Sequence, residues 1–129
     1  MTTPRSQQNK TYRIGELAAE FGVTLRALRF YEDKGLLSPT RIGRTRVYSC
    51  KDRVRLKLIT LGKRVGLSLF DIKRLIEMYD PEDNRRQLSA ALKIGEIRLA
   101  VLQNERDQID KSIAELAELL TQLRNELTG

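Results

Sequence analysis

The side chains best placed to do chemistry in this 129-residue sequence are arginines around two glycines. Arg26 and Arg29 follow Gly22, while Arg41, Arg44 and Arg46 surround Gly43. Basic side chains bind polyanions because each neutralised phosphate releases counterions. The spacing therefore points to nucleic acid, although arginines that are merely solvated would give the same pattern.

The positive charge is concentrated in the first part of the chain. The sequence has 24 Lys and Arg against 17 Asp and Glu, a formal net charge of +7. Residues 1–74 hold 17 basic and 6 acidic side chains, which gives +11, whereas residues 75–129 hold 7 and 11, which gives −4. This asymmetry favours a polyanionic partner for the basic half, but a generic solvated surface would share it.

The composition excludes several kinds of catalytic and metal site. The sequence has no His, and Cys50 is its single cysteine. A Cys/His zinc site, a histidine-activated nucleophile and an intrachain disulfide therefore cannot be built. Because there is also no glycine-rich phosphate loop, we expect no enzyme, no cofactor and no metal. No apolar run is long enough for a signal peptide or a membrane span, so we expect a cytoplasmic protein.

A helix-turn-helix would position the first two arginines. Apolar side chains share one face of a helix over residues 14–21, and Gly22 follows where a left-handed residue is often needed. Thr24 can cap a second helix that runs to about Lys34. The amino-terminal half of such a helix enters the major groove. The expected DNA contacts from this half are Thr24, Arg26, Ala27, Arg29 and Phe30. An ordinary helical hairpin remains the alternative.

A two-stranded wing is expected to position the other arginines. Pro39 and Gly43 interrupt a stretch over residues 40–48 that favours extended structure. Basic side chains at its tip can reach phosphates or an adjacent minor groove. These side chains are Arg41, Arg44 and Arg46.

A short strand at residues 12–13 and two further helices are expected to complete a domain over residues 11–80. Both helices begin with the spacing of a capping box, Ser49 with Asp52 and Ser68 with Asp71. The apolar stripes predicted to be buried are Val54, Leu58, Leu61 and Val65 in the first helix and Leu69, Ile72, Leu75, Ile76 and Tyr79 in the second. Lys63, near the junction of the two helices, is a further candidate for a phosphate contact.

The pattern after Pro81 is that of a coiled coil over residues 84–127, capped by Asp83 or Asn84. Alternating steps of four and three residues from Leu88 meet twelve positions, of which ten are apolar. The expected dimerisation residues are Leu88, Leu92, Leu99, Leu102, Arg106, Ile109, Ile113, Leu116, Leu120 and Leu123. A helix of about 60 Å cannot cover its own stripe, so we expect a second copy to pair with it. Folding back along the first domain is the alternative.

Arg106 is a charged residue within this stripe. A charge there is costly unless it is paired or reaches solvent, and its expected partners are Glu105, Asp107 and Asp110, from the same helix or its mate. Polar residues in such a stripe often fix register, so a role in specificity is expected for Arg106.

Several segments together resemble the MerR family of transcription regulators. They are Ile-Gly-Glu-Leu-Ala at 14–18, Val-Thr-Leu-Arg-Ala-Leu-Arg-Phe-Tyr-Glu at 23–32, Gly-Leu-Leu at 35–37, the wing at 43–49 and Gly-Leu-Ser-Leu at 66–69. The fold class implied is mainly α, a winged helix-turn-helix followed by a long coiled-coil dimerisation helix. The resemblance also implies an antiparallel homodimer on a pseudo-palindromic operator, which distorts promoter DNA so that RNA polymerase can engage it.

The resemblance adds two tyrosines, Tyr31 and Tyr48, to the expected DNA contacts. Phe30 stands where the family more commonly has a tyrosine, which removes one hydroxyl. Residues 53–59 look like those of regulators of leucine and isovalerate catabolism. Metal-sensing members carry cysteines after the coiled coil, and this chain has none there, so metal sensing is not expected.

Two other functions stay open at this point. The charge asymmetry also fits a coiled-coil adaptor whose basic head binds an acidic protein. Cys50 follows the expected cap Ser49 and has Lys51 and Arg53 nearby, which would favour a thiolate and a thiol-sensing regulator. A single cysteine is more often a small, inert residue.

Overall fold

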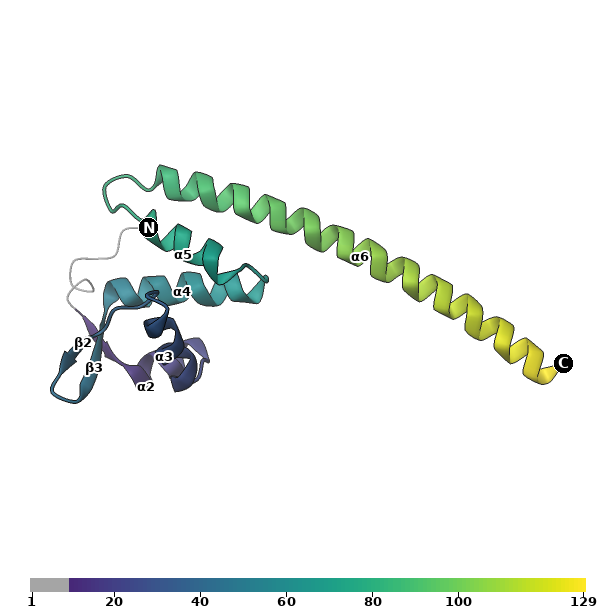
Figure 1. Ribbon diagram of the computed structural model, residues 1–129, viewed down its shortest axis with the longest axis horizontal. Coiled ribbons are helices and arrows are strands. Elements are labelled where there is room, and N and C mark those ends of the chain that lie inside the picture. The colour runs from purple at the N-terminus through teal and green to yellow at the C-terminus, as the bar shows by residue number, and fades with distance from the viewer. Residues whose placement is uncertain (1–9) are drawn as a thin grey trace. The chain divides into compact units, whose positions relative to one another are not determined.

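The computed structural model describes residues 10–129. The sequence predicts a polar, disordered tail over residues 1–10, and residues 1–9 of it lie outside the described residues. The chain divides into two compact units, residues 1–88 and 89–129. Its elements are β1 (Thr11–Arg13), α2 (Ile14–Phe21), α3 (Leu25–Asp33), β2 (Thr40–Ile42), β3 (Thr45–Ser49), α4 (Cys50–Arg64), α5 (Leu69–Glu77) and α6 (Arg85–Thr128) (Figure 1). The fold is mainly helical, with a small sheet and a long C-terminal helix, as the sequence predicted. Within residues 10–129, no helix combines the length and apolar character that crossing a membrane requires.

The helix-turn-helix forms at the predicted positions. Gly22 ends α2 with φ 64°, a backbone conformation that favours glycine, and its N–H donates to the carbonyl of Ala18. Thr24 then caps α3, because its Oγ1 accepts the N–H of Ala27 at 3.0 Å. These two local features set where α2 stops and where α3 begins.

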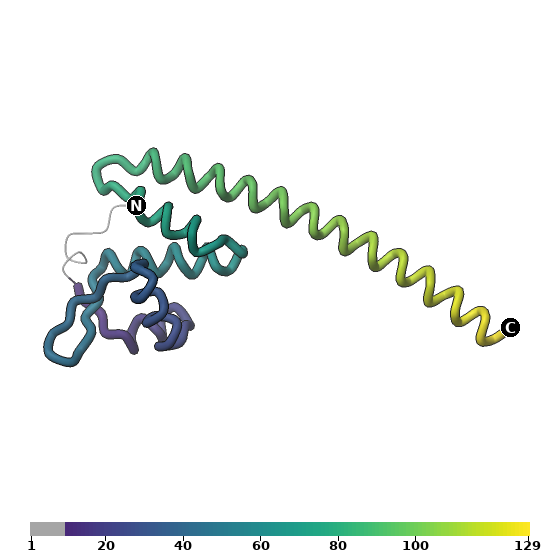
Figure 2. Tube along the Cα trace, viewed as in Figure 1, coloured from purple at the N-terminus to yellow at the C-terminus, as the bar shows by residue number. Residues whose placement is uncertain are grey.

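The wing is part of a three-stranded antiparallel sheet with the order β1-β3-β2. β2 and β3 form a hairpin whose turn contains Gly43 at φ 64° (Figure 2). Arg41 pairs with Arg46 across the hairpin, and Tyr12 pairs with Tyr48 on the other side of β3. The sequence predicted the hairpin and a short first strand, but it did not predict that the first strand joins the same sheet.

The buried stripe of α4 differs from the one predicted. The buried apolar side chains are Leu56 and Ile59, whereas three of the four predicted residues are exposed: Val54, Leu61 and Val65. The sequence of α4 holds two apolar stripes, and packing against α5 selects between them. Gly62 lies on the buried one, and a Cβ there would be 2.9 Å from the side chain of Ile72. The absence of a side chain at Gly62 therefore lets α5 approach α4 closely.

Helix α5 is buried largely as predicted. Its buried side chains are Ile72, Leu75 and Ile76, and Ser68 caps it by accepting the N–H of Asp71 at 3.1 Å. The predicted burial of Tyr79 is wrong, because α5 ends at Glu77 and the tyrosine is 45% exposed. A side chain beyond the end of the helix no longer follows the helical face.

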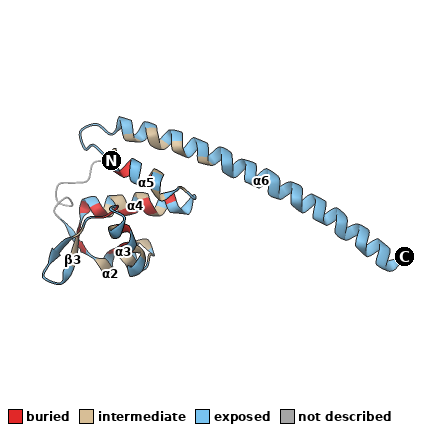
Figure 3. Ribbon diagram, viewed as in Figure 1, coloured by how far each residue is buried: buried red, intermediate tan, exposed pale blue. Residues whose placement is uncertain are grey.

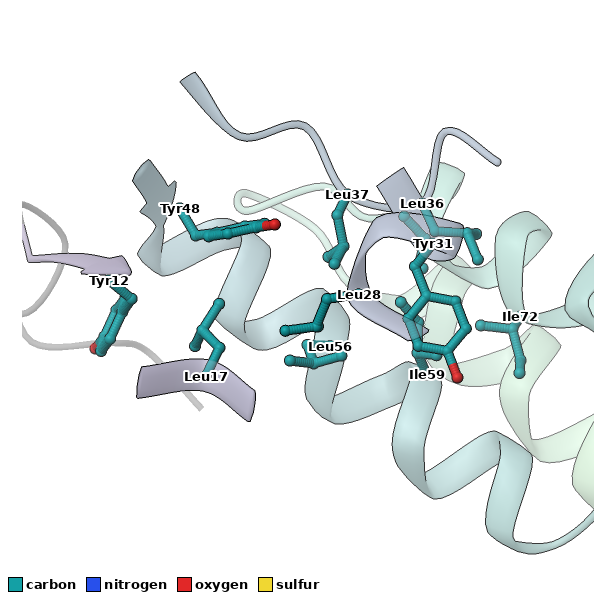
Figure 4. Packing of buried hydrophobic residues seen from close by; sticks show 11 residues of the cluster. Tyr12, Leu17, Leu28, Tyr31, Leu36, Leu37, Tyr48, Leu56, Ile59 and Ile72 are labelled. Carbon is teal, nitrogen blue, oxygen red and sulfur yellow. The ribbon is translucent and has the colours of Figure 1, made fainter. Parts of the chain in front are cut away.

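The hydrophobic core lies within residues 1–88 and joins the helix-turn-helix to the sheet (Figure 4). Leu17, Leu28 and Leu56 are fully buried and come from α2, α3 and α4. Tyr48 of β3 is fully buried with them. Because one cluster holds all these elements, α3 and the wing have a fixed spacing within this unit.

Helix α6 has no buried residue along its 44 residues. Asp83 accepts the N–H of Arg85 at its start, in agreement with one of the two predicted caps. Figure 3 shows the helix almost entirely in the exposed class. The apolar stripe predicted from the sequence is therefore uncovered in the single chain.

Candidate nucleic-acid interface

Helix α3 separates its side chains into a buried face and an exposed face. Leu28 and Tyr31 are buried in the core, and Ala27 packs against it. Arg26 and Arg29 are exposed. Neither arginine has an ion-pair partner among the described residues, so both guanidinium groups are available to phosphate or base edges.

Phe30 is 43% exposed, which is unusual for a large apolar side chain. The Nζ of Lys34 lies 5.5 Å from the centre of its ring. The Tyr31 ring centre is 5.9 Å from that of Phe30. Phe30 thus presents an apolar surface beside a cation on the same face of α3.

The wing presents three arginines in different ways. Arg41 and Arg44 are exposed near the turn. Arg46 is half-buried, and its Nε donates to Oε2 of Glu32 in α3 at 2.9 Å. One wing arginine is therefore tied to α3, while the other two have no ion-pair partner among the described residues.

An open cleft of about 620 Å³ connects these parts. The residues that line it are Arg13, Ile14, Gly15, Glu16, Arg29, Arg44, Thr45 and Arg46. The lining therefore includes four arginines and one glutamate. The electrostatics of the cleft favour an anion with several oxygens, such as a backbone phosphate.

The amino end of α2 adds backbone donors to the cleft. Its N-cap residue, Arg13, makes no capping hydrogen bond with its side chain. The first N–H groups of a helix lack intrahelical partners and carry partial positive charge, which suits an anion. Sequence reasoning missed Arg13 and this helix end. The signal was present, because no Ser, Thr, Asp or Asn precedes Ile14 to cap the helix.

The two tyrosines that the family resemblance nominated are buried. Tyr48 is 0% exposed, and its hydroxyl has no hydrogen-bond partner among the residues that the structure describes. Burial, together with the charge of Glu32, raises the pKa of Tyr48 above its ordinary value. Tyr31 is 8% exposed and lies in the same core (Figure 4). The prediction that Tyr48 contacts phosphate is therefore corrected, because its side chain supports the wing from beneath.

Two further residues predicted to contact DNA, Thr24 and Lys63, do not line the cleft. Thr24 is exposed, but its hydroxyl oxygen is already used to cap α3. Lys63 is exposed in the last turn of α4 and is not among the residues that line the cleft.

Cys50, the candidate sensor thiol, is a free thiol, 8% exposed, in the first turn of α4. A reagent in solvent would reach this thiol only with difficulty.

All ten predicted dimerisation residues are exposed. Leu88, in the first unit, is 58% exposed, and Leu92 and Ile113, in the second, are 64% and 61% exposed. Arg106 lies 3.9 Å from Asp107, one of its three predicted partners, and both side chains are well exposed. The pair is too exposed and too long to contribute measurably to stability.

Two family models match the chain. One is described as MerR HTH family regulatory protein and matches residues 12–79. The other is described as MerR, DNA binding, and matches residues 53–125. Together they cover the helix-turn-helix, the wing and most of α6.

Individual relatives agree with these models. The HTH-type transcriptional regulator HmrR of Rhizobium leguminosarum bv. viciae is 31% identical over 107 residues, 82% of this chain and 76% of that protein. A homologue of the transcriptional activator SoxR from Chromobacterium violaceum is 34% identical over 113 residues, with 82% and 76% covered. The crystal structure of a MerR-family regulator from Bacillus cereus is similar with a TM-score of 0.68 and 30% identity, over 84% of this chain and 79% of that one.

Proposed function

The chain belongs to the MerR family of DNA-binding transcription regulators, and on this premise we propose that it binds a pseudo-palindromic promoter operator as a homodimer. Like its relatives, which are transcription regulators, the chain is a regulator and not an enzyme. We also propose that the dimer distorts this operator and that RNA polymerase is its partner at the same promoter. The protein would act in the cytoplasm. The finer likeness to leucine-catabolism regulators stays a prediction.

The DNA contacts we propose come from the exposed arginines of the first unit. Arg26 and Arg29 would enter the major groove with the amino-terminal half of α3. Arg41 and Arg44 would follow the backbone from the wing. The cleft with Arg13 at its edge would hold one phosphate. The single observation that carries this proposal is that cleft, since it combines four guanidinium groups with an uncapped helix end.

The homodimer is proposed from the uncovered stripe of α6. Ten apolar positions repeat over more than five heptads, and none is buried. Fully burying one such side chain contributes at most about 1.5–3 kcal/mol, so covering the whole stripe gives pairing a substantial driving force. Pairing through α6 would also join two copies of the DNA-binding unit in one molecule. Two such units related by a two-fold axis would match two half-sites related by the same axis.

We further propose that the dimer distorts the operator. Bending or twisting a duplex costs deformation energy, and the phosphate contacts added when both DNA-binding units engage would offset that cost. This is the step through which the dimer would act on RNA polymerase.

The test starts from a random duplex library of about 30 base pairs, long enough for two half-sites. Selection with the unaltered protein should enrich one sequence with two-fold symmetry, and its affinity should fall steeply with salt. Arg29→Gln should weaken binding to that duplex about tenfold, the loss expected for one charge-assisted contact. Arg124→Gln, which removes the same charge from the far end of α6, should bind as the unaltered protein does. Equal affinities of the two variants would refute the proposed interface.

A further inference from the structure

The ion pair between Glu32 and Arg46 is the feature of the interface that DNA binding alone does not explain. A carboxylate on the recognition helix should repel DNA, yet Glu32 is on the same helix as Arg26 and Arg29. Its Oε2 accepts from Nε of Arg46 at 2.9 Å. The side chains of Arg46 and Glu32 are only 23% and 21% exposed, so water and salt screen this pair less than a surface pair.

The pair uses only one edge of the guanidinium group. Nε is bonded to Glu32, while Arg46 also lines the arginine cleft with Arg29 and Arg44. Among the described residues, the terminal nitrogens of Arg46 make no hydrogen bond, so they remain available to an anion. Arg41 and Arg44, by contrast, have no carboxylate partner among the described residues and must be ordered when DNA binds.

The strand that carries Arg46 is itself fixed. Side chains alternate along a strand, so Arg46 and Tyr48 share one face of β3. Tyr48 anchors that face in the core with no exposure at all. Burial, and after it the charge of Glu32, raise the pKa of Tyr48 above its ordinary value. The backbone beneath Arg46 therefore cannot drift away from α3.

We infer that Glu32 is a positioning residue for DNA binding, which holds the wing residue Arg46 with its terminal nitrogens aimed at a phosphate in the cleft. The inference rests on the proposed function. Holding the guanidinium in advance removes the ordering cost that a free arginine has on binding. The carboxylate thus favours DNA binding through Arg46, although its own charge opposes it.

The test compares two variants that each remove one negative charge from the end of α3. Asp33→Asn is the matched control, because Asp33 is exposed and adjacent to Glu32 in sequence. Simple electrostatics predicts tighter duplex binding for both variants. If Glu32 positions Arg46, Glu32→Gln should instead bind the selected duplex about tenfold more weakly, and its salt slope should fall by about 0.9, the value for one lost phosphate contact.

A double-mutant cycle separates positioning from a general effect on folding. Arg46→Gln should weaken binding to a similar extent, and adding Glu32→Gln to it should cause no further loss. The inference would be overturned if the two affinity losses were additive, or if Glu32→Gln bound the duplex as tightly as Asp33→Asn. Neither outcome would affect the proposed function. Failure of the unaltered protein to prefer any duplex would overturn both. Circular dichroism of each variant at the assay temperature checks that the head is folded.

Discussion

Replacing Asp52 by Ala tests how the loop before the wing is held in place. The Asp52 side chain is almost completely buried, and its carboxylate accepts three hydrogen bonds. They come from the N–H of Ser38 at 3.0 Å and from the N–H and hydroxyl of Ser49, each at 3.2 Å. Arg55 adds an ion pair at 3.6 Å. One side chain thus joins the start of α4 to the loop that follows α3.

The expected loss follows from these contacts. Leaving the N–H of Ser38 without its partner costs about 1–3 kcal/mol, and loss of the cap interaction costs about 0.5–2 kcal/mol. Asp52→Ala should therefore lower the free energy of unfolding by about 3 kcal/mol. Asp52→Asn should lose less, because its amide oxygen can still accept one of the bonds.

The assay is urea unfolding followed by circular dichroism, at one protein concentration because association shifts apparent stability. Asp71→Ala is the matched control. Asp71 occupies the same position relative to Ser68 in α5, but its carboxylate makes no hydrogen bond among those of the described residues. Its replacement should cost less than about 1 kcal/mol, the range of a helix-dipole interaction. Similar losses for the two alanine variants would refute the reasoning.

Three further changes have expected outcomes. Tyr48→Phe should raise the free energy of unfolding by about 1 kcal/mol in thermal or urea unfolding, because it removes an unpartnered buried hydroxyl; weaker duplex binding by this variant would restore Tyr48 as a DNA contact. Gly62→Ala should lower stability by about 1–2 kcal/mol, because its Cβ would meet the buried Ile72 at 2.9 Å; unchanged urea unfolding would show that Ile72 can move aside. Ile109→Glu should sediment as a monomer at micromolar concentration, while Gln108→Glu, outside the stripe, should stay dimeric; the proposed interface would be contradicted if both variants sedimented as dimers.

Local sequence signals predicted where most of the elements begin and end. Thr24 and Ser49 cap their helices as expected, and Gly22 ends α2 in a left-handed conformation. These predictions succeed because each depends on residues within one turn of each other. The two capping spacings show the limit of such reasoning. Ser49 with Asp52 forms the full reciprocal box, whereas at α5 only the Ser68 half forms.

Patterns that depend on distant partners were less predictable. The stripe of Val54, Leu61 and Val65 has good helical spacing, yet the residues buried in the core are Leu56 and Ile59. Periodicity shows that a helix has an apolar face, but it cannot choose between two such faces. That choice depends on where α5 approaches, and Gly62 sets the approach through its missing side chain.

Some features of the candidate site could likewise be predicted from local sequence, and others depend on distant partners. Residue types and spacing alone indicated a basic head, a helix-turn-helix, a wing and a long apolar stripe, because charge and helical period are properties of the chain itself. Only the tertiary structure decided that Tyr48 is a support, that Arg13 reaches the cleft and that Glu32 holds Arg46. Each of these depends on side chains far apart in sequence that meet only when α3 and β3 pack on one core.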